Sequence, residues 1–491
     1  MLYQISVADP ASRFIEIRYT IPAIQSESIE VQLPAWRPGR YEIQNFAKYI
    51  QRLEVQGGSG QLRSFRKVTK DRWLIDTTGE QEVVISYNFY ANIQNAGSSY
   101  VDEDLWYLNF INFCFYTEGR IDEPCRIELA LPDGYEVACG MPQVEKHSLR
   151  AEDFYQLVDS PLLASDSLQH EQYEEGGVHF HVWMYGNLRP NWKRIRTDFA
   201  RFSREQIAMM REFPEKEFHF LNLILPTAFY HGVEHRNSTM IVLGPDDEGE
   251  GLYTDLLGVS SHELFHAWNI IRIRPAELLP YDFTRENYFP TCFVAEGCTT
   301  YYGDLFLRRS GVFNDEAYFK ELQVYMKRHF EHSAGASQSL IESSLDLWLD
   351  GYEKGIPRRK VSVYHKGALV AMILDLYLRK KHNHARSIDD VMRLLWQRFG
   401  KPFVGYTLDD YKAIVEEVAE QPLDWYWQEC ITTNTPLEAR LNEALSFVGL
   451  QMTTFSNGNV QLNVLDDARA TLQRERWLTS AYVLTEEEEE G

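Results

Sequence analysis

The residues best suited to do chemistry stand together in the segment HELFH at 262–266. On a helix, imidazoles at positions i and i+4 lie one above the other, where their two neutral nitrogens can share one Zn²⁺ ion. Glu263 follows the first histidine and can act as a general base toward a water molecule on such a metal. Two core-facing histidines are the alternative, but residues 253–271 are helical in pattern and Pro275 follows them. The motif therefore predicts a metal-dependent hydrolytic site with His262 and His266 as ligands.

A third protein ligand has to come from elsewhere, because catalytic zinc sites use three protein ligands and leave one position open. Glu296 is the best candidate, since it lies on the next predicted helix, 293–309. A glutamate inside an otherwise apolar and aromatic helix is costly unless it is paired or binds a metal. A carboxylate that only favours the dipole at a helix start is the alternative. We expect one Zn²⁺ ion per chain, held by His262, His266 and Glu296.

The elements that position these residues change type along the chain. Residues 1 to about 165 contain β-branched and aromatic runs, for example 14–19, 28–33 and 82–90, that predict antiparallel strands. Residues 218–225 and 238–243 predict two strands ahead of the metal helix, which is the order of a thermolysin-like domain. Later segments are mainly helical in pattern, and 447–464 predicts two short strands.

We therefore predict an α+β multidomain fold with three domains and a short C-terminal segment. The domains are an N-terminal antiparallel β domain at 1–165, a thermolysin-like catalytic domain at 166–310 and a helical domain at 311–445. The remaining segment, 446–491, ends in an acidic run at 486–490 that we expect to be solvated. At about 100–200 residues per domain, the chain length of 491 accommodates this division.

Composition limits the partners and the compartment. The chain has 49 Lys and Arg against 72 Asp and Glu, a net charge of −23, which argues against a nucleic-acid partner. No run of about 18 apolar residues predicts a membrane span, and the first residues lack a secretory signal pattern. Six cysteines without a C-x-x-C pair are typical of free thiols in a reducing compartment, so we expect a cytoplasmic protein. The sequence leaves the oligomeric state open.

Several motifs carry a family resemblance. HELFHAWNIIRIRP at 262–275 and AEGCTTYYGDLFLRRSG at 295–311 resemble the glycyl aminopeptidase family of gluzincin metallopeptidases. Further similar segments are LPAWRPGRYEIQNFAKYI at 33–50, HGVEHRNST at 231–239, SSLDLWL at 343–349 and VSVYHKGALVAMILDLYLR at 361–379. The resemblance implies that His262, His266 and Glu296 are zinc ligands and that Glu263 is the general base. It also implies an aminopeptidase that removes small N-terminal residues such as glycine or alanine.

The resemblance also implies which residues bind substrate. The segment GVEH at 232–235 is similar to one that holds the free α-amine in related aminopeptidases, so Glu234 is the expected amine anchor. Gly232 and His235 flank it as further substrate-binding candidates, and a surface turn with one charge is the alternative. Tyr364 resembles the tyrosine with which gluzincin aminopeptidases stabilise the oxyanion. The other candidates for stabilising the oxyanion are Tyr301, Tyr302 and His365. The implied partner is a peptide with a free N-terminus.

The sequence departs from the family pattern at three places. His231-Gly232 replaces a common Gly-Gly pair, and Cys292 replaces an aromatic residue four positions before the third ligand. The family usually ends in a PDZ domain, and the segment 446–491 is too short for a complete one. A zinc endopeptidase and a catalytically silent peptide-binding module on the same fold remain alternative functions.

Four residues near these motifs have open roles. Arg272 and Arg274 could bind a substrate carboxylate or pair with inner acids. Trp36 and Arg37 could reach the active cleft from a loop of the β domain.

Overall fold

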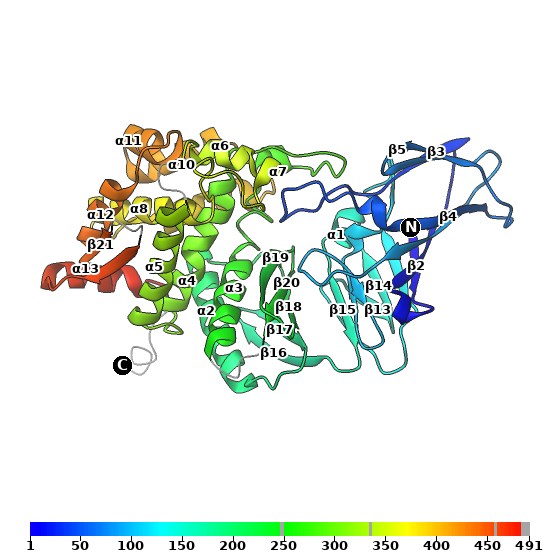
Figure 1. Cartoon of the computed structure of the whole chain (residues 1–491), viewed down its shortest axis with the longest axis horizontal. Coiled ribbons are helices and arrows are strands. Elements are labelled where there is room, and N and C mark those ends of the chain that lie inside the picture. Colours follow the sequence, from blue (N-terminus) through cyan, green and yellow to red (C-terminus); the bar gives the residue numbers. More distant parts are fainter. Residues whose placement is uncertain (246–249, 333–335, 456–458, 483–491) are drawn as a thin grey trace.

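The computed structural model describes residues 1–245, 250–332, 336–455 and 459–482. The acidic run at 486–490 lies outside the described residues. Figure 1 shows an elongated molecule with β-sheets at the N-terminal end, a central sheet flanked by helices, and a helical region at the other end. Within the described ranges, no helix is both long and apolar enough to cross a membrane.

The N-terminal β domain contains three sheets whose strands are antiparallel except for the parallel pair β1 and β11. Buried and exposed side chains alternate along its strands, as in β2, where Ile15, Ile17 and Tyr19 face the core. The seven-stranded sheet runs β13 (Gln143–Glu145), β14 (Ser148–Ala151), β11 (Cys125–Leu129), β1 (Leu2–Ser6), β2 (Phe14–Ile21), β7 (Val83–Tyr90), β4 (Ile50–Gly57). The two four-stranded sheets run β10 (Tyr116–Thr117), β3 (Ser28–Gln32), β6 (Arg72–Asp76), β5 (Phe65–Thr69) and β12 (Glu136–Cys139), β15 (Leu162–Ser165), β9 (Trp106–Leu108), β8 (Tyr100–Val101).

The central sheet has the order β16 (Gln169–Glu175), β17 (Val178–Tyr185), β18 (Glu217–Ile224), β20 (Ser238–Gly244), β19 (Phe229–Glu234). β18 pairs in parallel with β17 and β20, and its nearly continuous apolar run is buried on both faces. One face packs on α2 (Trp192–Met210) and α3 (Glu250–Phe265) through residues such as Phe220 and Ile241. The other face packs, through Leu221 and Val242, on Tyr107 and Leu163 of the N-terminal domain.

β19 is an antiparallel edge strand that the sequence did not predict. The segment around Glu234 was expected as a connection between two strands, and the structure makes Glu234 the last residue of this strand. Its weak apolar pattern, with Tyr230 exposed and Val233 buried, explains why the strand was missed.

The C-terminal half is helical and confirms the predicted α+β fold class. The helix α8 (His365–Lys381) is buried along most of its length and packs on α4, α5, α9 and α12. The other helices are α4 (Thr299–Arg309), α5 (Asp315–His332), α6 (Leu340–Leu345), α7 (Leu347–Asp350), α9 (Ile388–Leu395), α10 (Leu408–Ala419), α11 (Asp424–Tyr426), α12 (Glu438–Phe447) and α13 (Ala468–Leu478). A hairpin of β21 (Leu450–Thr454) and β22 (Val460–Val464) occupies the segment for which the sequence predicts two strands. The helix α13 was not predicted. A short helix, α1 (Phe154–Val158), belongs to the N-terminal domain.

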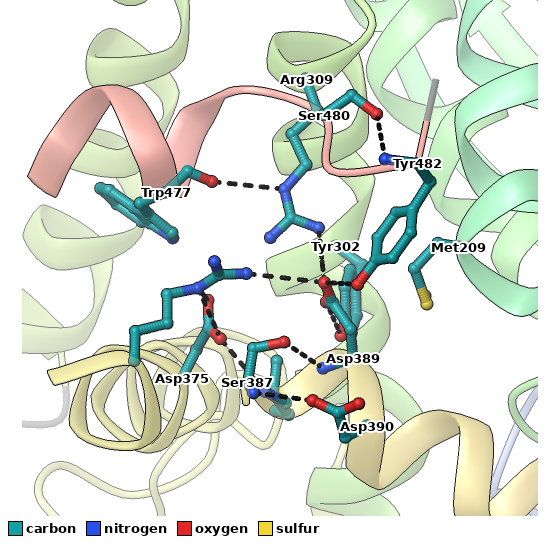
Figure 2. Close-up of polar contacts among 12 residues, drawn as sticks. Met209, Tyr302, Arg309, Asp375, Ser387, Asp389, Asp390, Trp477, Ser480 and Tyr482 are labelled. Carbon is teal, nitrogen blue, oxygen red and sulfur yellow. Dashed lines mark hydrogen bonds and ion pairs between the residues drawn. The ribbon is translucent and has the colours of Figure 1, made fainter. Parts of the chain in front are cut away.

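A buried ionic network fastens these helices to one another (Figure 2). Asp389 on α9 receives hydrogen bonds from Tyr302 on α4 at 2.6 Å and from Tyr482 at 2.9 Å. Arg309 and Arg379 lie 3.2 and 3.5 Å from the same carboxylate, and all three charged side chains are almost fully buried. The network therefore joins α4, α8 and α9 to the chain that follows α13.

Candidate active site

The metal helix α3 ends at the candidate histidines. His262 and His266 direct their Nε2 atoms at each other, 3.0 Å apart. The Nδ1 atom of His266 donates to the backbone oxygen of Asn269 at 2.7 Å, which directs its Nε2 atom toward the other candidate ligands. The backbone turns sharply after Asn269, where Ile270 has a φ of +98°, a strained conformation for a β-branched residue.

Glu296 comes from a π-helical turn, Phe293–Cys298, that precedes α4. The sequence predicted a regular helix over 293–309, so this turn corrects it. The extra residue of a π turn redirects side chains and loosens local carbonyl bonding, and such turns are frequent at functional sites. The side-chain nitrogen of Asn269 donates to the carbonyl oxygens of Val294 and Ala295 at 2.9 and 3.1 Å. One residue thus orients His266 and braces the turn that holds Glu296.

The three candidate ligands converge on one point. The Oε2 atom of Glu296 lies 3.4 Å from Nε2 of His266 and 3.8 Å from Nε2 of His262. Two imidazole nitrogens, once deprotonated, and a carboxylate oxygen at these separations would fit a metal ion with bonds of about 2.0–2.2 Å. The residues present therefore fit a catalytic metal.

The electrostatics of the group favour a cation. Burial lowers the pKa of His266, but the neighbouring Glu296 overrides this effect and raises it to about 10. Burial also raises the pKa of Glu234 to about 7 and that of Glu263 well above its usual range. Three carboxylates share a space from which water is largely excluded, so a positive charge between them is strongly stabilised.

Glu263 and Glu234 lie beside this centre. Ligand atoms of Glu234, Glu263 and His266 fall within 4.8 Å of one another. A Cβ atom added at Gly232 would lie only 2.2 Å from Oε1 of Glu263, so the glycine on β19 leaves room for that carboxylate.

A loop of the N-terminal domain lies against Glu234 at the candidate active site. The added Cβ of Gly39 would lie 2.7 Å from Oε2 of Glu234, and Gly39 has a φ of +77°. Trp36 in this loop donates to the backbone oxygen of Asp282 at 2.7 Å. The blue loop is seen reaching from the N-terminal domain toward β19 and α7 (Figure 1). The guanidinium of Arg37 is buried and donates to Ala96. Its positive charge opposes the rise in the pKa of Glu234 and Glu263 that burial causes.

The side chain of His235 does not point toward the candidate metal ligands. Its Nδ1 atom lies 2.8 Å from Oδ1 of Asp159, and its Nε2 atom has no hydrogen-bond partner among the described residues. Asp159 also accepts from the backbone N–H of Arg236 at 2.9 Å. The structure thus ties His235 to the N-terminal domain and does not bring it into the group of metal-ligand candidates.

Tyr364 lies at the start of α8, half-buried against the cluster that contains Tyr41 and Cys292. Burial raises its pKa well above the usual range, with Glu296 as the next contributor, so its hydroxyl keeps its proton. An added Cβ at Gly297 would lie 2.6 Å from Cα of Gly367, which shows that α8 and the π turn touch through their backbones. This contact brings the start of α8 to Glu296.

The other candidates for stabilising the oxyanion make contacts away from the candidate metal ligands. The hydroxyls of Tyr301 and Tyr302 donate to Asp375 and Asp389 at 2.6 Å, inside the buried network. The ring of His365 lies 6.1 Å from that of Tyr325 in a stacked arrangement.

Sequence reasoning missed three residues that build the site and one that holds His235 away from it. Gly39 and Gly367 act through the absence of a side chain, and Asn269 acts through its amide. Asp159 binds His235 and keeps it away from the candidate ligands. The signals available were the Gly after Pro38 and the Gly near Tyr364, but neither reveals its distant neighbour in the fold.

The comparisons with known proteins agree with this geometry. Family profiles described as the peptidase M61 N-terminal domain and as M61 glycyl aminopeptidase match residues 2–166 and 255–370. No curated protein gives a significant match. Among solved structures, an aminopeptidase N family protein from Idiomarina loihiensis is 29% identical with a TM-score of 0.86, and the match covers 92% of this chain and 79% of that one.

More distant structures share the fold. A variant of an M1 zinc metallopeptidase from Deinococcus radiodurans, bound to a Tyr-Ser-Ala substrate, is 13% identical with a TM-score of 0.55. The match covers 89% of this chain and 94% of that one. The predicted family is therefore confirmed: the chain belongs to the M61 glycyl aminopeptidase family and is a metallopeptidase.

Proposed function

We propose that this metallopeptidase is a zinc-dependent aminopeptidase that hydrolyses the first peptide bond of peptides with a free N-terminus. The observation that carries the proposal is Glu234, a carboxylate that is 93% buried next to Glu263 and His266. No ion pair to Glu234 occurs among the described residues. A buried carboxylate without a direct ion pair is costly, and the α-ammonium of a substrate supplies one.

The proposed metal ligands are His262, His266 and Glu296, and two imidazoles with one carboxylate are typical of a catalytic Zn²⁺ ion, one per chain. When bound, zinc supplies Lewis acidity, which lowers the pKa of a water molecule and polarises the scissile carbonyl.

The chain's own residues supply the rest of the reaction. Glu263 accepts the proton of the attacking water and later passes it to the leaving amine. Tyr364 donates its hydroxyl proton in a hydrogen bond to the developing oxyanion. Glu234 holds the substrate by its amine, and the backbone of Gly39 lies against the carboxylate of Glu234. This arrangement supports cleavage one residue from the N-terminus.

We also propose a preference for small N-terminal residues, glycine or alanine, which the description of the matching family supports. The six cysteines are all free and buried, which supports a reducing, cytoplasmic environment.

The test compares alanine p-nitroanilide with its N-acetylated form, and adds the variant Glu234→Gln. We expect the wild type to hydrolyse only the free amine, and Glu234→Gln to lose about 30-fold or more in kcat/KM, because a buried charge pair loses one partner. Equal rates on the free and the acetylated substrate would instead support an endopeptidase. A zinc-loaded protein that hydrolyses neither substrate, nor a longer peptide, would support a peptide-binding module.

A further inference from the structure

A cavity lies apart from the candidate metal ligands, where the N-terminal domain meets later parts of the chain. It has a volume of about 350 Å³ and none of the candidate metal ligands lines it. Its walls include Asp159 after α1, Arg272 and Arg274 after the metal helix, and Phe403 from a loop between α9 and α10. We call this cavity the arginine pocket.

Two guanidinium groups in the arginine pocket have no acidic partner among the described residues. The Nε atom of Arg272 is buried without a hydrogen-bond partner, and its Cζ atom lies 4.9 Å from the ring centre of Phe403. Arg274 is 91% buried and donates only to backbone carbonyls, including that of Ile271 at 2.9 Å. The sequence left open whether these arginines pair with inner acids, and in the structure they form no such pair.

The carboxylates that line the same cavity are already engaged. Glu152 pairs with Arg236, whose guanidinium also binds Glu215. Asp159 binds His235 and the backbone N–H of Arg236, and Asp153 caps the start of α1. The pocket therefore has two uncompensated positive groups and no free negative one among the described residues.

Aromatic rings form the remaining wall. Arg274 lies over the rings of Tyr281 and Phe403, at 4.3 and 5.1 Å from their centres. Phe403 has a φ of +54°, a left-handed conformation that is rare and costly for a bulky side chain. Such strain persists only where the surroundings enforce it, and here it holds the ring beside both guanidiniums.

We propose that the arginine pocket binds an organic carboxylate with an apolar or aromatic body. The carboxylate takes the two guanidiniums, which match its planar geometry, and the body rests on the aromatic wall. The size of the cavity suits a ligand as large as an N-blocked aromatic amino acid. This binding is separate from the proposed amine anchor and does not depend on it.

The test uses the zinc-loaded protein and two probes of equal shape, N-acetyl-L-phenylalanine and its amide, in calorimetric titrations. The acetyl group keeps both probes from using Glu234. We expect the carboxylate to bind about tenfold or more tightly than the amide, because a hydrogen bond between charged groups contributes more to the binding free energy than one to a neutral amide. In Arg272→Gln, where only Arg274 remains, the preference for the carboxylate becomes smaller, whereas the matched control Arg285→Gln, which removes an exposed positive charge, keeps the full preference.

Three results would overturn the proposal: no binding of the carboxylate, equal affinity of the wild type for both probes, or a preference that is undiminished in Arg272→Gln. The last result is the one expected if the probe binds the zinc ion instead. Thermal unfolding checks that Arg272→Gln is folded. If it is not, Phe403→Gly, which removes the ring and relieves the backbone strain, must weaken binding of both probes, and unchanged binding contradicts the proposal.

Discussion

Replacing Gly297 by alanine tests the contact that joins the proposed zinc ligand to α8. The added Cβ would lie 2.6 Å from Cα and 2.7 Å from the carbonyl carbon of Gly367. Ordinary contacts begin near 3.4 Å, so the two backbones must separate by about 0.8 Å. Because the neighbours are main-chain atoms, no side chain can rotate to relieve the clash.

The expected effects follow from this displacement. Overpacking of this kind costs about 1–3 kcal/mol of stability. Glu296 precedes Gly297, and Tyr364 lies at the start of α8, so the shift separates a proposed metal ligand from the proposed oxyanion donor. A misplacement approaching 1 Å in an active site costs up to about 100-fold in rate. We therefore expect kcat to fall by tenfold to 100-fold.

The matched control is Gly258→Ala in α3, where the only neighbour of the added Cβ is Oδ1 of Asp304 at 3.7 Å. Both substitutions gain about the same helix propensity, so the difference between the two variants isolates the clash. The assay is alanine p-nitroanilide hydrolysis together with denaturant unfolding. If Gly297→Ala is as stable and as active as Gly258→Ala, the backbone contact does not position the site.

Three further outcomes are expected. Asn269→Ala removes the amide that braces the π turn, and we expect zinc affinity to fall about 10–100-fold in competition with a chelator; unchanged affinity would contradict the bracing role. Tyr364→Phe should lower kcat about 100-fold while zinc content stays the same, and an unaltered kcat would remove its oxyanion role. Burial opposes ionisation of Asp389, but Arg309 and Arg379 hold its pKa well below the usual range, so its stabilising contribution is present above about pH 4 and is lost as pH falls below it. Asp389→Asn should cost about 3–5 kcal/mol at pH 7, with a smaller loss in acid, and an equal loss at both pH values would contradict this assignment.

Local patterns predicted much of the fold. The spacing of His262 and His266 placed both imidazoles on one helical face, and the isolated glutamate at 296 stood out from its apolar helix. Alternation of apolar and polar residues along strands such as β2 and apolar periodicity along helices such as α9 supported the α+β class. These signals act over a few residues, so the sequence contains them directly.

Features that depend on distant contacts could not be predicted. The π turn at Glu296 is braced by Asn269, 27 positions earlier, whose side-chain amide donates to two of its carbonyls. Gly39 and Glu234 meet only because a loop of one domain crosses to another, and no local pattern describes that crossing. His235 was expected to bind substrate, and its bond to Asp159 depends on an N-terminal residue whose role the sequence does not show.

The most direct test of the account measures zinc content and peptide hydrolysis in the same preparation of Glu263→Gln. Its carboxylate is not among the three proposed ligands, and it is the proposed proton acceptor. The account predicts one zinc ion per chain, as in the wild type, with turnover of alanine p-nitroanilide at least about 100-fold lower. Retained turnover would show that another group acts as the base, and loss of the metal would show that Glu263 belongs to the metal site itself.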